Sequence, residues 1–364
     1  MELLRLLLLA VVAGLLASPV LAVEEPLTQA ENDPRFEEVN GLLQDGDIAE
    51  ALDLLDALTA DYPGDSTIDY TRALAFYING EPDLALASLD DAITRQEAAE
   101  ATPDALSASY LLRARVNLQR GAVEDAFSDY AEAIRYEPDN VQPYLSRARL
   151  YETAQEYERA LADYSRALEL QPENTDILIQ RANAALQADD PQSALVDMNR
   201  AVEILPEDPQ LYIIRAKVHV ILRDDRAAAQ DYTTWLERIT QSEETLEAVN
   251  AEAGATLEMD MELGSLYRIP FEATVGQLVY TMATSPTVDG LIVILDPEGE
   301  PLVADDDSGG DLNPFIHGYA LPMTGTYTLL VGHARGGFTG TLELILTTVT
   351  GESARLTPVT VSAF

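Results

Sequence analysis

The densest group of chemically capable side chains in this 364-residue sequence is an acidic loop in its last quarter. Carboxylate and amide oxygens at close spacing are the ligands that a hard cation such as calcium prefers. The loop departs from the EF-hand pattern, because no glutamate stands twelve residues from the first ligand. A solvated acidic turn is the alternative interpretation. The predicted calcium ligands are Asp305, Asp306, Asp307, Asp311 and Asn313, with Asp289 on the preceding turn.

The residues that could catalyse a reaction do not form a recognised set. His219, His317 and His333 are scattered, with no metal-ligand spacing and no nucleophile elbow to join them. Ser308 precedes two glycines, but no histidine stands in a matching context. The sequence contains no cysteine, which excludes disulfides, thiolate metal sites and cysteine nucleophiles. We therefore expect a non-enzymatic protein that requires no cofactor, with calcium as the candidate ion.

Four arginines recur every 34 residues, at Arg113, Arg147, Arg181 and Arg215. A row of guanidinium groups would suit an anionic ligand. Alternatively, each arginine pairs with the aspartate that follows sixteen residues later, on the second helix of its own unit. We favour the pairing. The aspartates are Asp129, Asp163, Asp197 and Asp231.

The arginine interval belongs to a repeat that organises residues 32–238. Ala126, Ala160, Ala194 and Ala228 keep the same spacing. Within each unit, apolar residues recur at helical spacing in two blocks, which a short turn separates and a proline closes. A fixed period of this length predicts stacked helical hairpins rather than one globular core. We count about six units, beginning near residues 32, 66, 107, 141, 175 and 209.

The repeat is irregular at the turns, at one step and at its end. The step from Ala85 to Ala126 is seven residues longer than the period, and we place the extra residues around 96–102. In the sixth unit Trp235 replaces an alanine, and we expect it to cover the exposed last hairpin. The turn glycine of the first three units is replaced in the others by residues less suited to left-handed backbone, namely Gln155, Asp189 and Arg223.

This pattern resembles the tetratricopeptide repeat, most fully over residues 110–138 and 144–172. The resemblance implies an α-α superhelix in which the first helix of each unit lines a groove for a protein or peptide. The apolar track and isolated cations on these helices would suit a peptide with apolar anchors and one or two carboxylates. Alternatively, these residues only cover the joints between hairpins. The mapped positions are Leu111, Arg115, Leu118, Leu145, Arg149, Ile179, Asn183, Leu186, Ile213, Lys217 and Val220.

A second domain is predicted over residues 254–349, after a polar helical linker at 239–253 and before a tail at 350–364. Its apolar residues change from a period of 3.6 to a period of 2. Short strands separated by turns, with no helices between them, predict an antiparallel β-sandwich or jelly roll. The expected strands are Leu266–Ile269, Gln277–Met282, Leu291–Leu295, Ile316–Leu321, Thr326–Val331 and Thr341–Leu346.

The order of elements in this region is similar to the prepeptidase C-terminal domain, a β-sandwich appended to secreted bacterial proteins. The most specific part is the strand start Gly325-Thr326-Tyr327. The resemblance implies an accessory module linked with secretion, folding or surface attachment.

The N-terminal sequence predicts where the protein is located, and its net charge limits which partners it can bind. Residues 1–22 have the apolar run and small-residue end of a secretory signal, and an uncleaved anchor is the alternative. The formal net charge of −41 argues against a nucleic-acid partner. We expect export to the periplasm, the cell surface or the medium, with no membrane span after signal cleavage.

These observations together predict a non-enzymatic scaffold for protein–protein interaction, whose groove binds a protein or peptide and whose β-sandwich is an accessory docking or stabilising module. The alternative function is a structural cell-envelope protein in which a calcium-dependent β-sandwich does the binding.

Overall fold

A computed structural model describes residue 28 and residues 30–240, 242–262, 264–306, 313–333 and 340–350. The chain divides into two compact units, Met1–Pro172 and Glu173–Phe364. The boundary falls between the fourth and fifth helical hairpins, so the last two hairpins belong to the same unit as the strands.

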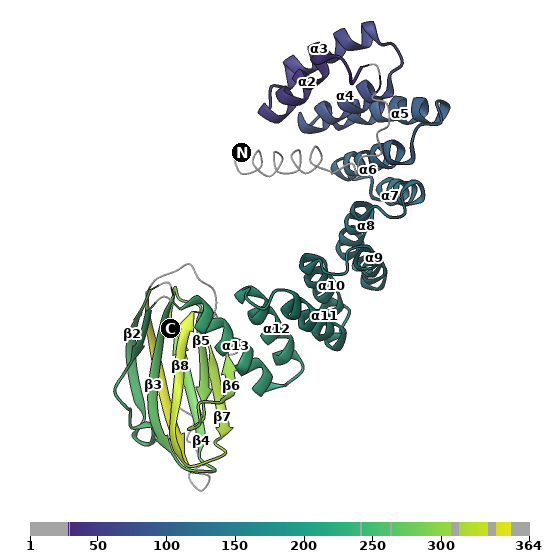
Figure 1. Cartoon of the computed structure of the whole chain (residues 1–364). Helices are drawn as coiled ribbons and strands as arrows, with labels where there is room; N and C mark the ends of the chain where they lie inside the picture. The colour runs from purple at the N-terminus through teal and green to yellow at the C-terminus, as the bar shows by residue number, and fades with distance from the viewer. Residues whose placement is uncertain are drawn as a thin grey trace. The chain divides into compact units, whose positions relative to one another are not determined.

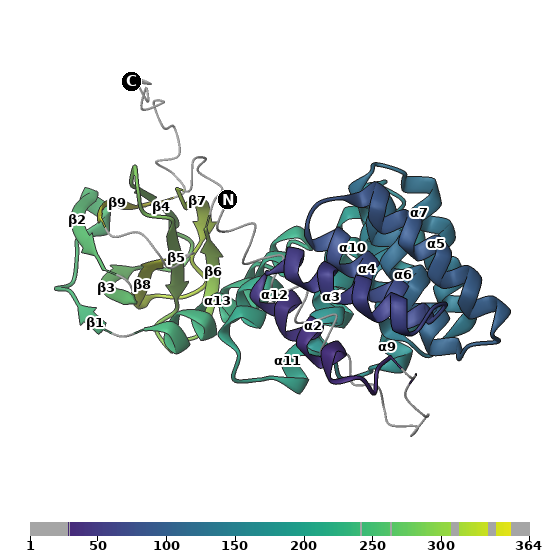
Figure 2. The same cartoon turned by 90° about the horizontal axis from the view of Figure 1, so that it is seen from above.

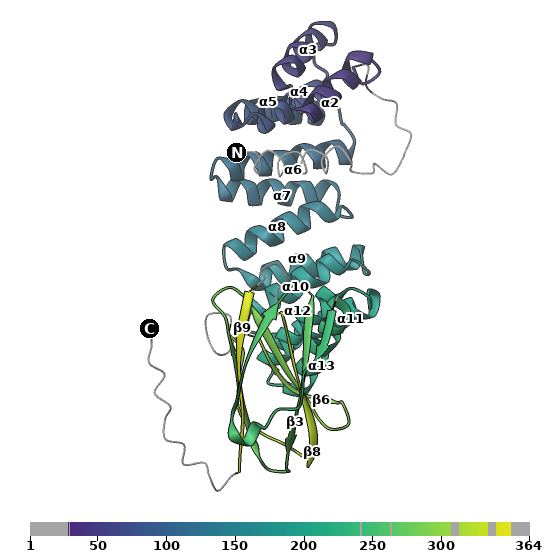
Figure 3. The same cartoon turned by 90° about the vertical axis from the view of Figure 1, so that its left-hand side faces the viewer.

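Among the described residues, twelve helices form six hairpins at the predicted positions, which confirms the repeat. In the first unit, successive hairpins lie one beside the next (Figure 3). These helices are α2 (Pro34–Asp45), α3 (Ile48–Asp61), α4 (Ser66–Ile78), α5 (Pro82–Ala98), α6 (Pro103–Gln119), α7 (Val123–Tyr136), α8 (Val141–Thr153) and α9 (Tyr157–Leu170). The second unit adds α10 (Thr175–Gln187), α11 (Pro191–Ile204), α12 (Pro209–Ile221) and α13 (Asp225–Ile239).

Polar caps begin most of the first helices of the hairpins. The side chains of Asp65, Asn140, Asn174 and Asp208 accept hydrogen bonds from backbone N–H groups in the first turn of α4, α8, α10 and α12. Such caps satisfy N–H groups that have no partner within the helix. The sequence thus sets where each hairpin starts.

The repeated alanines lie where the helices approach most closely. Ala126, Ala160, Ala194 and Ala228 are at most 1% exposed. A larger side chain at these positions would separate helices that pack with few voids. The large residue four positions later in each unit fills the space beside them, and all of these are buried: Tyr130, Tyr164, Met198 and Tyr232.

Every hairpin turn contains one residue in the left-handed region. The turn glycines Gly46, Gly80 and Gly121 have φ of 84°, 76° and 77°. The residues that replace glycine in the last three hairpins keep the same conformation, with φ of 60° at Gln155 and 59° at both Asp189 and Arg223. The turn is therefore maintained where the preferred residue is lost.

The seven extra residues lengthen two helices. Helix α5 has 17 residues where α3 and α7 have 14, and α6 has 17 where α4 and α8 have 13. Three residues in α5 and four in α6 account for the insertion, on either side of the connection at 99–102. The predicted position at 96–102 therefore holds for the end of α5, and the rest lies at the start of α6.

The strands of the second unit form two packed sheets (Figures 1 and 2). One sheet has the order β1-β3-β8-β5-β6 and the other the order β2-β9-β4-β7. All neighbours pair antiparallel except β1 and β3. The strands are β1 (Ser242–Thr245), β2 (Ala255–Met261), β3 (Ser265–Ala273), β4 (Leu278–Thr284), β5 (Gly290–Leu295), β6 (Pro301–Asp305), β7 (Phe315–Ala320), β8 (Gly325–His333) and β9 (Gly340–Val349).

The predicted helical linker at 239–253 is wrong. Helix α13 ends at Ile239, Ser242–Thr245 form β1, and Ala251–Ala253 form a short 3-10 helix. This polar segment lies along the exposed edge of β3, where backbone hydrogen bonds such as that from Leu246 N to Arg268 O hold it. Long-range pairing here overrides the local pattern.

The apolar strand β5 is buried on both faces. Ile292 and Ile294 point into the core between the two sheets. Leu291, Val293 and Leu295 point the other way and pack against α12 and α13. A continuous apolar run, rather than an alternating one, is what such a position requires.

Helix α13 lies across the outer face of the five-stranded sheet, against β5 and β6 (Figure 2). Trp235 is 2% exposed and shares a cluster with Leu291 and Leu330 of the sheet. The expectation that Trp235 covers an exposed last hairpin is therefore corrected, since the sheet itself covers that hairpin.

Candidate functional site

The four arginines that recur every 34 residues, here called the arginine column, form ion pairs within their hairpins, as predicted. Each guanidinium contacts the aspartate of the second helix through two nitrogens, with N–O distances from 2.5 to 3.2 Å. The four aspartates are at most 6% exposed. The pairs are Arg113–Asp129, Arg147–Asp163, Arg181–Asp197 and Arg215–Asp231.

These ion pairs connect the two helices of a hairpin. The hydrogen bonds to Asp163 raise the pKa of Arg147, while its partial burial opposes the shift. A buried carboxylate without this partner would carry an uncompensated charge. The arginine column is therefore part of the scaffold, and a ligand site must be sought among other residues.

The first unit brings five of the predicted groove residues onto α6 and α8. Leu111 and Leu145 are 7% and 9% exposed, Leu118 and Arg115 are half-buried, and Arg149 is exposed. Leu111 and Leu118 belong to one apolar cluster that also includes Leu150 of α8. Leu111 and Leu118 therefore help to join α6 to α8, which fits the alternative interpretation, and the groove positions stay a prediction.

Arg115 differs from the arginines of the column. Its Nη1 atom is buried and has no hydrogen-bond partner among the described residues. Burial raises the pKa of Tyr70 on α4 and of Tyr130 on α7, and the Arg115 charge opposes both shifts, which places the guanidinium near two tyrosines. Arg115 as a whole is half-buried, so the exposed part of its side chain can contact a carboxylate although Nη1 is closed to solvent.

The other six predicted groove residues lie in the second unit, on α10 and α12. Ile179 and Leu186 are half-buried, and Asn183 and Val220 are exposed. By contrast, two residues of α12, Ile213 and Lys217, contact the β domain. Ile213 packs in the cluster with the five-stranded sheet, and the Nζ atom of Lys217 lies 3.5 Å from Asp306.

The structure places the predicted calcium ligands in several contacts. Asp305 accepts a hydrogen bond from the Phe315 N–H group, Asn313 accepts one from the Ser285 N–H group, and Asp289 is buried. Asp307 and Asp311 lie outside the described residues. Among the residues that are described, no group of three or more His, Asp or Glu side chains is arranged to hold a metal ion. Calcium binding at this loop stays a prediction.

The three histidines lie on separate elements. His219 is on α12, 3.8 Å from Asp231, and burial lowers its pKa. His317 is on β7, where its ring meets Tyr280 edge-on with centroids 5.0 Å apart. The backbone of His333 ends β8 in the other sheet.

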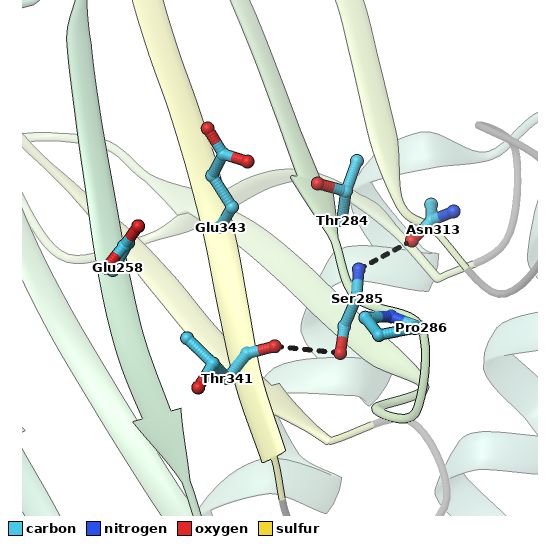
Figure 4. Close-up of a pocket in the computed structure, with 7 residues that line it drawn as sticks. All are labelled: Glu258, Thr284, Ser285, Pro286, Asn313, Thr341 and Glu343. Carbon is cyan, nitrogen blue, oxygen red and sulfur yellow. Dashed lines mark hydrogen bonds between the residues drawn. The ribbon is translucent and has the colours of Figure 1, made fainter. Parts of the chain in front are cut away.

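A cleft of about 390 Å³, which was not predicted from the sequence, lies at one end of the four-stranded sheet. Glu258 of β2 and Glu343 of β9 face each other in register, and Thr284 of β4 is opposite Glu343 (Figure 4). Asn313 and Ser285 close one side through their hydrogen bond of 3.0 Å. The sequence signal for this cleft is the alternation of apolar and polar residues over 255–261, which predicts a strand with Glu258 on its outer face.

Comparison with known families agrees with the geometry of the helices. The tetratricopeptide repeat family matches residues 36–105, 111–175 and 145–209. These residues form a tetratricopeptide repeat region. Such repeats are scaffolds, typically without catalytic activity, that mediate binding of proteins and peptides. In this chain the repeat region precedes a β domain of two sheets.

Solved structures of repeat proteins are similar to part of this chain at low sequence identity. The C-terminal part of a tetratricopeptide repeat-containing protein from Cytophaga hutchinsonii is 17% identical, with a TM-score of 0.50 over 56% of this chain and 78% of that one. YrrB, described as a repeat protein with an unusual peptide-binding site, is 15% identical, with a TM-score of 0.42 over 50% of this chain and 91% of its own. MamA from Desulfovibrio magneticus is 15% identical, with a TM-score of 0.40 over 48% and 94%.

A comparison with curated proteins finds no matching relative. Across the described part of the chain, no helix has both the length and the apolar character needed to cross a membrane.

Proposed function

We propose that the protein is a non-enzymatic binding scaffold and that the first-helix face of the first unit, on α4, α6 and α8, binds a peptide. The ligand carries apolar side chains and at least one carboxylate. Arg115 and Arg149 contact the carboxylates, and the leucines beside them support the apolar side chains. Lys217 is left out of this surface because it lies beside Asp306.

One observation carries this assignment, namely that the half-buried Arg115 has no carboxylate partner among the described residues. The Nη1 atom itself is closed to solvent. A ligand carboxylate would therefore contact the exposed part of the half-buried Arg115 side chain and compensate its positive charge. Arg115 lies between Leu111, one turn before it, and Leu118, one turn after it, on the same helix. An apolar side chain and a carboxylate of one short peptide could therefore be bound together.

We further propose that the chain is exported after cleavage behind Ala22 and that the β domain is an accessory module. The signal-like sequence of residues 1–22 supports export, and the resemblance to the prepeptidase C-terminal domain supports the accessory role. Mass spectrometry of the protein from a bacterial host tests the first point. A mature chain beginning at Val23 supports export, and a chain that retains residues 1–22 contradicts cleavage.

Selection from a random peptide library tests the binding proposal. The full chain is immobilised, and enriched peptides are measured by fluorescence anisotropy against purified variants. We expect enriched sequences with Asp or Glu among apolar residues, and we expect Arg115→Gln to weaken their binding about tenfold, the loss of one charge-assisted contact. Arg200→Gln is the matched control, because Arg200 is exposed on a second helix and its one ion pair among the described residues is with Glu203.

Two results would overturn the assignment. One is an enriched set without carboxylates. The other is binding that Arg115→Gln and Arg200→Gln weaken equally, which would indicate a general charge effect rather than a site.

A further inference from the structure

The outer face of the four-stranded sheet carries an apolar surface that no described helix covers. Ile345 of β9 is 40% exposed, and its register partner on β4 is Met282. Met282 in turn is opposite Phe315 of β7, and Tyr280 is opposite His317. The outer face of the four-stranded sheet thus presents apolar and aromatic side chains, although the protein as a whole is strongly acidic.

This apolar surface is continuous with the acidic cleft. Glu343 and Ile345 are two residues apart on β9, so their side chains lie next to each other on the same face. Their register partners on β2 and β4 follow the same spacing: Glu258 and Thr284 are opposite Glu343, and Thr256 and Met282 are opposite Ile345. In the close-up, the cleft side chains rise from one face of neighbouring strands (Figure 4). One bound molecule would therefore contact both the apolar surface and the two carboxylates.

Within the described part of the chain, the two glutamates have no cationic partner. Like charges directly opposite each other on neighbouring strands are destabilising. None of the ion pairs among the described residues includes Glu258 or Glu343. Arg268 is the one lysine or arginine in the described part of residues 254–350, and it pairs with Glu243.

We propose that this face binds an extended basic peptide, with a lysine or arginine side chain between Glu258 and Glu343 and a neighbouring apolar side chain on Ile345 and Met282. Charge complementarity favours this occupant, because the ligand cation neutralises two opposed carboxylates. A second copy of the chain is a poor occupant, since each copy carries a net charge of −41. The site is separate from the helical face proposed above, which favours acidic peptides.

Fluorescence anisotropy with the full chain tests the proposal. The probe is a labelled octapeptide of alternating lysine and leucine, and a lysine–serine octapeptide of equal charge is the matched probe. At about 0.15 M salt, where long-range attraction is screened, we expect Glu258→Gln/Glu343→Gln to weaken binding of the lysine–leucine peptide about tenfold. Removing two opposed charges should not destabilise the sheet, so unfolding would not explain the loss.

A charge-matched control separates the site from the general acidity of the protein. Glu244→Gln/Glu247→Gln removes two exposed carboxylates elsewhere and should change the affinity less than about twofold. Ile345→Thr, which keeps a β-branched residue, should weaken binding of the lysine–leucine peptide and leave the lysine–serine peptide unchanged.

Four outcomes would overturn the inference. The first is no measurable binding, and the second is an equal loss of affinity in the two double variants. The third is that calcium binds in a titration, dependent on Glu258 and Glu343, while the peptide does not bind; the fourth is that the chain forms a dimer that Ile345→Thr dissociates. The first two would remove the site, the third would make it a metal site, and the fourth would assign the face to a second copy.

Discussion

The turn inside each hairpin needs one residue in the left-handed backbone region, and the six repeats meet this need with four residue types. Glycine adopts the conformation without steric cost, whereas a residue with a Cβ atom loses about 1–2 kcal/mol there. A Cβ atom added at Gly121 would meet no atom within 4 Å, so backbone conformation alone decides the preference.

We therefore predict that Gln155→Gly stabilises the first unit. Glycine gains freedom in the unfolded chain, which offsets part of the benefit, so the expected increase in the free energy of unfolding is about 0.5–1 kcal/mol. Urea denaturation measures it. Gly121→Ala is the inverse control and should lower the stability by a similar amount; a stabilising Gly121→Ala would contradict the argument.

The arginine–aspartate pairs make a second prediction at the scale of residues. Arg147→Met leaves the Asp163 carboxylate buried without its partner and should cost about 3 kcal/mol, toward the low end for a buried pair because Arg147 is partly exposed. Arg147→Met/Asp163→Leu should cost less than the sum of the two single changes, since it leaves no unpaired charge. Additive costs in urea denaturation would show that the pair does not act as a unit.

Among the elements, the contact between α13 and the sheet depends on one glycine. A Cβ atom on Gly332 of β8 would overlap with Cδ2 of Leu236, which is 1% exposed. Gly332→Ala should therefore cost about 1–3 kcal/mol, as overpacking does in a dense core.

A double-mutant cycle isolates this contact. In a Leu236→Ala background the space is open, so Gly332→Ala should cost about 1 kcal/mol or less when unfolding is measured in urea. An equal cost in both backgrounds would place the origin of the effect in the strand rather than in the helix contact.

Elements with many repeated signals were predictable, and elements held by long-range pairing were not. The hairpins follow from several columns in step at one period, such as Ala126 and Ala160. The strand β1 has the sequence Ser-Glu-Glu-Thr, which no local preference assigns to a strand; it exists because β3 offers a free edge. The strand β6 is short and begins at Pro301, so its local signal is weak as well.

The same distinction holds for the sites. The pairing of Arg147 with Asp163 was predictable, because both lie in one hairpin at fixed spacing. The cleft was not, because Glu258 and Glu343 meet only through the register of β2 and β9. The groove prediction included Ile213 because the family pattern contains no β domain to contact that helix.

In the whole molecule, the last two hairpins and the β domain form one unit. The single lysine of the sequence, Lys217, lies in this unit. Lys217 of α12 lies 3.5 Å from Asp306, beyond the end of β6. We predict that a carbodiimide, which joins amines directly to carboxylates, links Lys217 to the acidic segment at Asp306. Peptide mass spectrometry identifies the link, and Asp306→Asn should lower its yield. Links from Lys217 only to carboxylates of the helices would contradict this arrangement.

The proposed activity also assigns different surfaces to different parts of the chain. The first-helix face of the first unit, with Arg115, favours acidic peptides, while the outer face of the four-stranded sheet, with Glu258 and Glu343, favours basic ones. The protein would then bring two partners of opposite charge together on one scaffold.

Photo-crosslinking shows directly whether a peptide binds on the first-helix face. Gln142 is exposed on α8, one turn before Leu145 and two turns before Arg149, whereas Glu158 is exposed on the second helix of the same hairpin. Gln142→benzoylphenylalanine and Glu158→benzoylphenylalanine are each irradiated with a peptide obtained by selection on the full chain. We expect a covalent adduct from position 142 that excess unlabelled peptide suppresses, and little from position 158. An adduct from position 158 alone, or equal adducts from both, would contradict it.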